Sequence, residues 1–151
     1  MSARSADLAA VSIPLTLLWV TVAILRRAVV ISNQGHFVYA LDDPYIHMAI
    51  AKHLVSHGVW GVTGDGFGSA SSSLVWTSAL ALVYRIVGAS AEAPFVMALL
   101  CATGLLVVAY LLLRQVGLPR VYTSMLLVVL IYLTPLPALV FTGQEHILHM
   151  L

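Results

Sequence analysis

The chain has 151 residues, of which 61% are hydrophobic and only 9% are charged. A soluble domain carries roughly 25% charged residues, so the charged side chains of this protein are too few to cover the surface of a soluble domain. The mean hydropathy of +1.01 indicates an integral membrane protein. This hydrophobicity excludes intrinsic disorder, and a net charge of +1 lacks the basic face of a nucleic-acid binder. A single cysteine, Cys101, excludes a disulfide framework within the chain.

Three apolar stretches, at about 8–31, 95–113 and 121–141, approach the roughly 20 residues that a membrane-spanning helix needs. We expect the first to be a retained helix, because its apolar run is longer than that of a signal peptide and no small-residue cleavage site follows it directly. Pro135 and Pro137 should end or kink the third stretch near its far end. The sequence thus predicts an all-α membrane bundle forming a single unit over residues 1–151.

A fourth apolar stretch, 74–87, is shorter and contains Arg85. If it spans the membrane, four helices place Asp42 and Asp43 on the opposite face from Glu145. If it is re-entrant or interfacial, three helices place these acids on the same face, with an outer loop over about 33–94. Positive charge supports this model only in part. We favour three spans.

Residues 44–57 carry consistent signals of a short helix. Asp43 suits the N-cap and Pro44 the first helical position, and Gly58 suits the position after the helix. Ile46, Ile50 and Leu54 repeat every four residues, with Ala49 and Val55 beside them, whereas His47, Lys52 and His53 lie largely off this stripe. The pattern predicts an amphipathic helix lying along the membrane surface.

The adjacent acids Asp42 and Asp43 permit two interpretations. In the first interpretation, these residues simply begin a helix, and one of the two carboxylates is explained as its N-cap. Two carboxylates are more than a cap requires, and neighbouring acids in a poorly solvated site repel each other. Such a pair suits a fixed anion beside a general base, or a metal ligand beside one.

Four segments together resemble the outer-loop motifs of bacterial GT-C membrane glycosyltransferases. They are Tyr-Ala-Leu-Asp-Asp-Pro-Tyr-Ile-His (39–47), His-Gly-Val-Trp-Gly (57–61), Ser-Ala-Ser-Ser-Ser-Leu-Val-Trp (69–76) and Thr-Gly-Gln-Glu-His (142–146). This superfamily resembles protein O-mannosyltransferases, aminoarabinose transferases and arabinofuranosyltransferases. Family members are several hundred residues long, so the resemblance implies the N-terminal part of a GT-C-like bundle. Gln144 stands where the family usually has Met or Leu.

The resemblance implies transfer of a sugar from a polyprenyl-phosphate lipid to a glycan, lipid or protein acceptor outside the cytoplasm. Asp42 would deprotonate the acceptor hydroxyl, Asp43 would support it or bind metal, and Glu145 would complete the acidic site. Three cations would neutralise the donor phosphate: Arg26, Arg27 and Lys52.

Many GT-C enzymes use a divalent ion, and His146 and His149 form an i, i+3 pair that could join Glu145 or the Asp pair in binding one. The alternative for both histidines is a polar helix face at the membrane interface. Trp60 and Trp76 are predicted to be interfacial anchors.

Ser71–Ser73 could contact a phosphate or sugar, or could cap the following helix. A small multi-pass transporter subunit and a non-catalytic membrane scaffold are the competing functions. The acids stand in loops and at helix ends, which disfavours a transport pathway through the bundle.

Overall fold

The computed structural model describes residues 3–151 and contains helices and loops, with no strand among those residues. The predicted all-helical class is confirmed. In chain order the helices are α1 (Ala3–Ser32), α2 (Asp43–His57), α3 (Leu74–Val87), α4 (Ala93–Gln115), α5 (Arg120–Leu133), α6 (Leu136–Val140) and α7 (His146–Met150).

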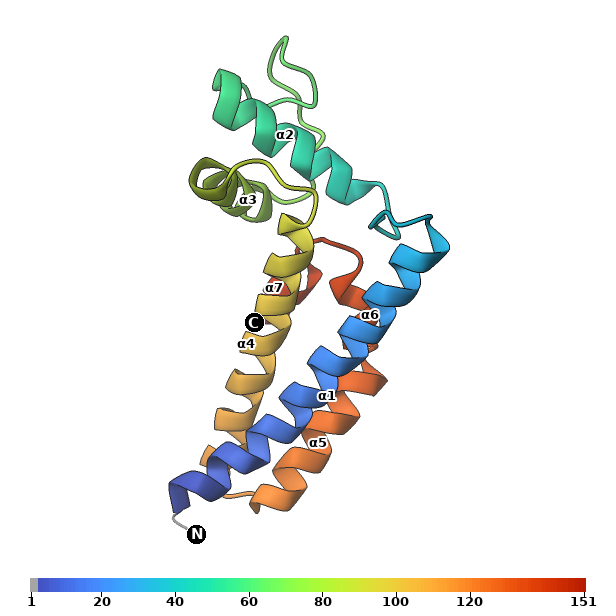
Figure 1. The fold of residues 1–151 in the computed structure, drawn as a ribbon. Coiled ribbons are helices and arrows are strands. Elements are labelled where there is room, and N and C mark those ends of the chain that lie inside the picture. The colour runs from blue at the N-terminus through green and yellow to red at the C-terminus, as the bar shows by residue number, and fades with distance from the viewer. Residues whose placement is uncertain (1–2) are drawn as a thin grey trace.

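The long helices α1 and α4, together with α5 and α6, form the body of the molecule, and the shorter helices α2 and α3 cover one end of it (Figure 1). α1 runs from the N-terminal end up to α2 and α3, α4 returns, and α5 with α6 runs back towards α2 and α3. α5 packs on α1 and α4, and α7 packs on α4. This up-and-down order places the loop after α1 and the loop before α7 near the same end.

Two helices are long and apolar enough to cross a membrane, Ala6–Ser32 and Ala93–Gln115. The third expected span, 121–141, is divided, because α5 ends at Leu133 and α6 begins at Leu136. Pro135 lies in the break, where a proline removes a helix donor and clashes with the preceding turn. The predicted interruption by proline is thus confirmed, but α5 by itself is only 14 residues long.

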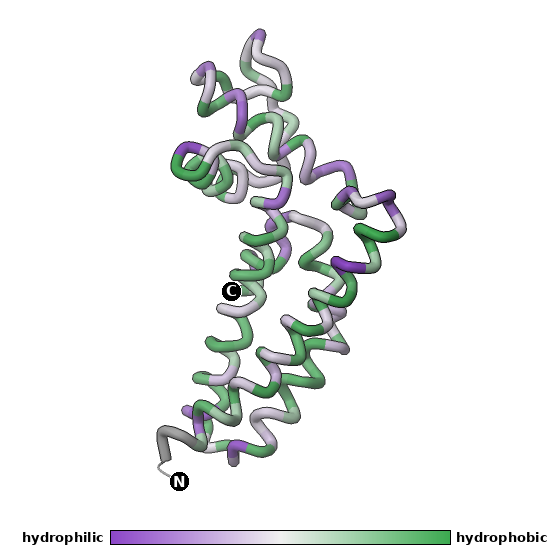
Figure 2. The backbone as a smooth tube through the Cα atoms, viewed as in Figure 1, coloured by the Kyte–Doolittle hydropathy of each residue, from purple (hydrophilic) through white to green (hydrophobic). Residues whose placement is uncertain are grey.

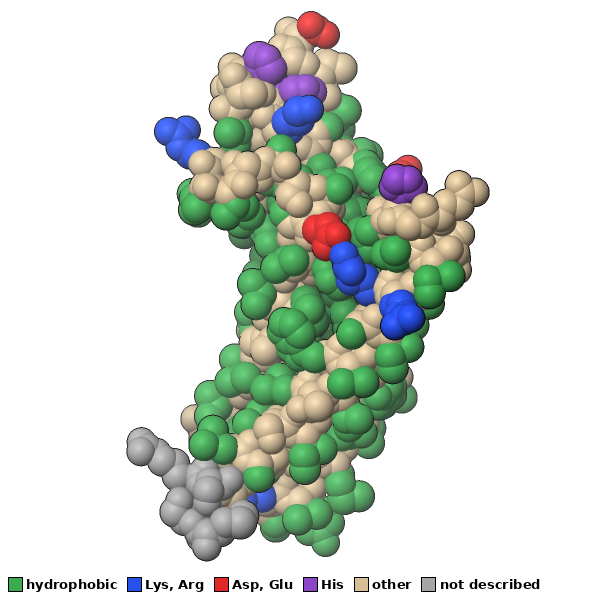
Figure 3. Space-filling model, viewed as in Figure 1, with side chains coloured by type: hydrophobic (Ala, Val, Ile, Leu, Met, Phe, Trp, Pro, Cys, Tyr) green, Lys and Arg blue, Asp and Glu red, His purple; other side chains and the backbone are tan. Residues whose placement is uncertain are grey.

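Hydrophobic residues follow the long helices along most of their length, whereas hydrophilic residues concentrate towards the α2 and α3 end (Figure 2). On the face drawn in Figure 3, most charged and His side chains also gather at that end. Leu18 and Val22 of α1 are buried with Leu106 of α4 and Ile131 of α5 in a common core. The long helices therefore combine a shared core with an apolar outer surface, as helices in a lipid environment do.

α2 ends as the sequence predicts, but a different face of it is buried. Gly58 adopts the left-handed conformation (φ 68°) that closes the helix. The buried residues are Pro44, His47, Ile50 and Ala51, whereas Ile46 and Leu54 of the expected stripe are only half-buried. This face packs on α3. Ile50, at the middle of the expected stripe, is therefore covered by protein and not by the membrane, whereas Val55 of the same stripe is still 36% exposed.

α3 matches the predicted apolar stretch 74–87 residue for residue. The Ser73 hydroxyl accepts a hydrogen bond from the Trp76 backbone N–H at 3.3 Å, which caps the helix. Figure 1 shows α3 almost end-on beneath α2, whereas α4 runs along the length of the molecule. α3 thus lies across the long helices. This orientation favours an interfacial helix over a membrane-spanning one for residues 74–87.

Tyr39 fastens the loop after α1 to the start of α4. Its hydroxyl donates to the Ala91 carbonyl at 2.6 Å and accepts from the Phe95 backbone N–H at 3.0 Å. The ring is 6% exposed and meets Phe37 edge to face, with 5.1 Å between the ring centroids. Burial raises the pKa of Tyr39, so the hydroxyl stays protonated as a donor.

Tyr39→Phe should lower the free energy of unfolding by about 1–3 kcal/mol, because it leaves the buried Phe95 N–H without its partner and removes the hydrogen bond to the Ala91 carbonyl. Thermal unfolding in detergent measures the loss. Tyr122→Phe is the matched control, since Tyr122 is 59% exposed. Equal unfolding midpoints for the two variants would contradict the role of Tyr39.

Candidate functional site

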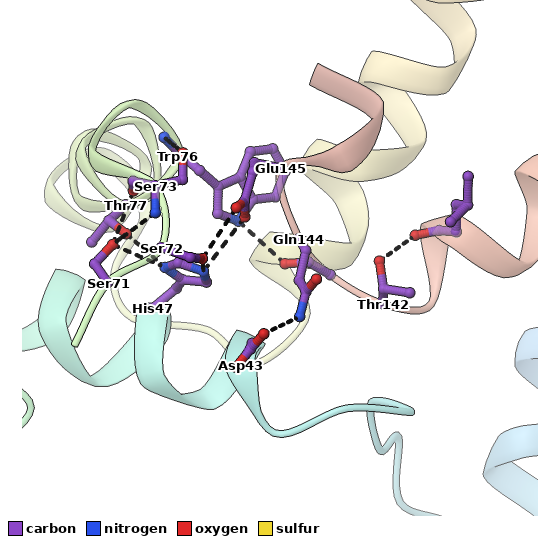
Figure 4. Close-up of polar contacts among 12 residues, drawn as sticks. Asp43, His47, Ser71, Ser72, Ser73, Trp76, Thr77, Thr142, Gln144 and Glu145 are labelled. Atoms are coloured by element: carbon purple, nitrogen blue, oxygen red, sulfur yellow. Dashed lines mark hydrogen bonds and ion pairs between the residues drawn. The ribbon is translucent and has the colours of Figure 1, made fainter. Parts of the chain in front are cut away.

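The two acidic motifs of the sequence lie in direct contact. Gln144 Nε2 donates to Asp43 Oδ2 at 2.8 Å, and Ser72 Oγ donates to Glu145 Oε1 at 3.1 Å. Trp76 Nε1 donates to the Gly143 carbonyl at 3.2 Å. Figure 4 shows these side chains converging from the start of α2, the serine turn before α3, α3 itself and the loop before α7.

The close approach of these segments depends on Gly143. Its φ is +60°, and a Cβ added there would lie 2.5 Å from Tyr39 Cε1 and 3.2 Å from Pro44 Cβ. A distance of 2.5 Å is far inside van der Waals contact, so a larger residue would push the loop away from α2. Glycine alone therefore satisfies both the backbone conformation and the space.

His47 lies at the centre of the site and is 1% exposed. Its Nδ1 is hydrogen-bonded to Thr77 Oγ1 at 2.7 Å, and its Nε2 lies 3.3 Å from Ser72 Oγ and 3.5 Å from Glu145 Oε2. Burial lowers the pKa of His47, while the negative charges of Glu145 and Asp43 oppose this shift. The imidazole is thus held in place on both of its nitrogens.

Glu145 is 6% exposed, and its Oε2 is buried with no hydrogen-bond partner. This oxygen lies 3.5 Å from His47 Nε2. A buried carboxylate oxygen without a donor is costly, and the hydrogen bond that Ser72 donates to Oε1 offsets part of this cost. Its carboxylate faces the interior, which suits it to fixing the site and does not suit it to meeting a substrate.

The acidic pair is arranged differently from the sequence prediction. Asp42, not Asp43, occupies the N-cap position, and its side chain makes no capping hydrogen bond. Asp43 is the first residue of α2, and Pro44 is the second. The Gln144 amide holds Asp43, whereas Asp42 is exposed. The pair therefore consists of one fixed and one accessible carboxylate.

The three predicted phosphate-binding cations do not share one cluster. Arg26 Nη2 pairs with Glu92 Oε1 at 2.6 Å and lies over the Phe37 ring. Arg27 follows on the same helix and is exposed, as is Lys52 on α2. Arg26 is thus engaged within the protein, and Arg27 and Lys52 are open to solvent on separate elements.

His146 and His149 stand on the exposed side of α7. Within residues 3–151, no three His, Cys, Asp or Glu side chains gather closely enough to hold a metal ion. The predicted divalent ion remains a prediction.

Sequence reasoning placed two central residues wrongly. Trp76 was predicted as an interfacial anchor, but it is 1% exposed and bonded to the Gly143 carbonyl. His47 was assigned to the polar side of α2, although it forms the buried face with Pro44, Ile50 and Ala51. The spacing i, i+3, i+6 and i+7 of these four residues is itself helical and was the available signal.

Comparison with models of known protein families, with curated proteins and with solved structures gave no match to this chain.

Gly143→Ala should lower the free energy of unfolding by about 1–3 kcal/mol, because the added methyl overpacks the contact with Tyr39. Gly64→Ala is the matched control, because nothing lies within 4 Å of a Cβ added at that position. Thermal unfolding in detergent separates the two variants. A Gly143→Ala protein as stable as Gly64→Ala would show that the loop does not need this close approach.

The lowered pKa of His47 predicts a pH-dependent stability. As the pH falls, the unfolded chain binds a proton on this residue before the folded chain does. The contribution is complete above the ordinary pKa of 6.5 and is lost as the pH falls towards the folded value. We expect the unfolding midpoint to decrease between about pH 7 and pH 5.

His47→Gln should flatten this dependence, and His36→Gln, which alters an exposed histidine, should leave it unchanged. Parallel profiles for the native chain and His47→Gln would assign the pH dependence to other groups.

Proposed function

We propose that this chain is part of a membrane glycosyltransferase that takes a sugar from a polyprenyl-phosphate donor and passes it to an acceptor outside the cytoplasm. The observation that carries the proposal is the contact between the acidic loop and the second motif, through Asp43 with Gln144 and Ser72 with Glu145. These motifs lie about a hundred residues apart in sequence. They are also the segments that resemble the GT-C outer loops.

The accessible Asp42 is the proposed general base. In the reaction, Asp42 accepts the proton of the acceptor hydroxyl while the acceptor oxygen bonds to the anomeric carbon of the sugar. The bond from that carbon to the phosphate oxygen breaks, and the polyprenyl phosphate leaves with the electron pair. Phosphate is a stabilised leaving group, so the main demands are a base, a correct orientation and nearby cations.

Asp43 and Glu145 have positioning roles in this proposal. Asp43 stays an acceptor for the Gln144 amide, which holds the start of α2 and thereby aims Asp42. Glu145 accepts a hydrogen bond from Ser72 and lies beside His47, and it thereby holds the serine turn in place. The exposed Arg27 and Lys52 are available to the donor phosphate, and Arg26 would join them when released from Glu92.

A three-span topology accompanies this function. α5 is about 21 Å long, and α6 adds about 7 Å beyond the break at Pro135, so that the two together would approach the roughly 30 Å thickness of the hydrocarbon core. With α1 and α4 they would make three crossings, and the acidic loops would then share the extracytoplasmic side. The protein would be a multi-pass component of the cell membrane.

Asp42→Asn should reduce sugar transfer by about 10²–10⁴-fold, because it removes the general base. Asp43→Asn should be milder, since an Asn carbonyl oxygen can still accept from Gln144. The assay is transfer from a radiolabelled polyprenyl-phosphate sugar in membranes containing the full-length gene product. Asp65→Asn, which alters an exposed acid in the same outer loop, serves as control.

Two outcomes would contradict these assignments. If Asp43→Asn is inactive while Asp42→Asn is active, the two carboxylates have the opposite roles. If both variants transfer at the native rate, the pair is only a helix start and the glycosyltransferase proposal fails.

A further inference from the structure

α3 has two apolar faces, and only one of them is used inside the protein. The buried face contains Trp76, Leu80 and Tyr84, at helical spacing. On the opposite face, Val75 is 67% exposed, Leu82 60% and Ile86 73%. Successive residues of a helix are about 100° apart, so the second set forms a stripe on the reverse side of α3. We call this set the outer stripe of α3.

The outer stripe continues onto a candidate membrane span. An apolar groove of about 330 Å³ lies between α3 and α4, lined by Val83 and Val87 on one side and by Val96 and Leu100 on the other. Val96 is 46% exposed and Leu100 is 59% exposed. Figure 3 shows hydrophobic side chains along the edge of α3 that faces the long helices. The surface is therefore apolar from α3 down the side of α4.

Length and charge identify what covers this surface. A helix of 14 residues is about 21 Å long, too short for the roughly 30 Å core of a bilayer. Arg85 is exposed beside the stripe, near the end of α3. An apolar stripe with a cation at its edge suits the boundary between acyl chains and phosphate headgroups.

The arrangement of α2 agrees with this placement. α2 packs on α3 with its apolar face, and its exposed side carries polar residues such as Lys52 and Ser56. A polar exterior is expected for the layer that faces water, and an apolar exterior for the layer that faces lipid. α2 and α3 thus form a cap with two different exposed surfaces. The polar surface on α2 suits water, and the apolar outer stripe on α3 suits lipid.

We propose that the outer stripe of α3 lies in the bilayer surface, among the acyl chains next to the headgroups, and that α3 anchors the site to the membrane. Trp76 and Thr77, on the buried face, contact Gly143 and His47. A fixed depth for α3 therefore sets the height of this site above the lipid. The inference rests on membrane insertion of the long helices and not on sugar transfer.

Nitroxide scanning tests the placement directly. In a Cys101→Ala background, single cysteines replace Val75, Leu82 or Ile86, and Lys52 or Ser56 provides the matched positions on α2. The labelled chains are reconstituted into vesicles of phosphatidylcholine and phosphatidylglycerol. Collision rates are then measured with oxygen, which partitions into lipid, and with a water-soluble nickel chelate.

We expect the ratio of oxygen to nickel collisions to be several-fold higher at all three outer-stripe positions than at Lys52 and Ser56. Nickel access at Val75, Leu82 and Ile86 equal to that at Lys52 would place the stripe in water and overturn the proposal. Low access to both reagents would show that protein covers the stripe, which also overturns it.

The three labels sit along the whole of α3, so a variant that fails to reconstitute leaves two independent readings. Transfer activity plays no part in the readout, and loss of the glycosyltransferase proposal would leave this result standing.

Discussion

The close approach of the loop 142–145 to the start of α2 is the contact on which the site depends. Gly143 permits it, since any Cβ there would collide with Tyr39. Once the loop is seated, the Gln144 amide reaches Asp43 and Glu145 reaches Ser72. Tyr39 is in turn bonded to the start of α4. One packing contact thus connects the acidic loop to the long helices.

The burial of His47 and Glu145 contributes both a cost and a gain to the free energy of folding of this region. Removing a carboxylate and an imidazole from water costs free energy that their mutual attraction does not always repay. The hydrogen bonds of His47 with Thr77 and of Glu145 with Ser72 offset part of that cost. The Oε2 atom of Glu145 is still without a hydrogen bond. Such a network stabilises one arrangement of the segments, because the buried groups lose their partners in any other.

The cap over the long helices separates two kinds of surface. α2 presents polar residues on its exposed side, and α3 presents an apolar stripe. α2 packs on α3, and the proposed lipid contact of α3 would place this cap at the boundary between water and lipid. Under the two proposals, a site in this position would meet a lipid-linked donor from the membrane and an acceptor from the solution. The same geometry keeps the predicted acids out of the interior of the long helices.

The local signals of the sequence determined the elements, and the tertiary structure decided which faces they bury. Gly58 ends α2, Ser73 caps α3 and Pro135 interrupts the last long stretch, because these residues act on the backbone next to them. Long apolar runs likewise predicted the helices α1 and α4, because each run is long enough for a helix that crosses a membrane. The motif resemblance pointed to Asp42, Asp43 and Glu145 without indicating how their segments meet.

The local sequence did not predict that the side chains of His47 and Trp76 are buried. A helical stripe that contains Ile50 can be drawn through Ile46 and Leu54 or through His47 and Ala51, and the choice depends on the partner helix. Trp76 suits a membrane interface as well as a core, and in the structure it lies in the core, where its Nε1 donates to the Gly143 carbonyl. A side chain's neighbours across space are absent from its local sequence, so only the packed structure determined which polar groups are buried together.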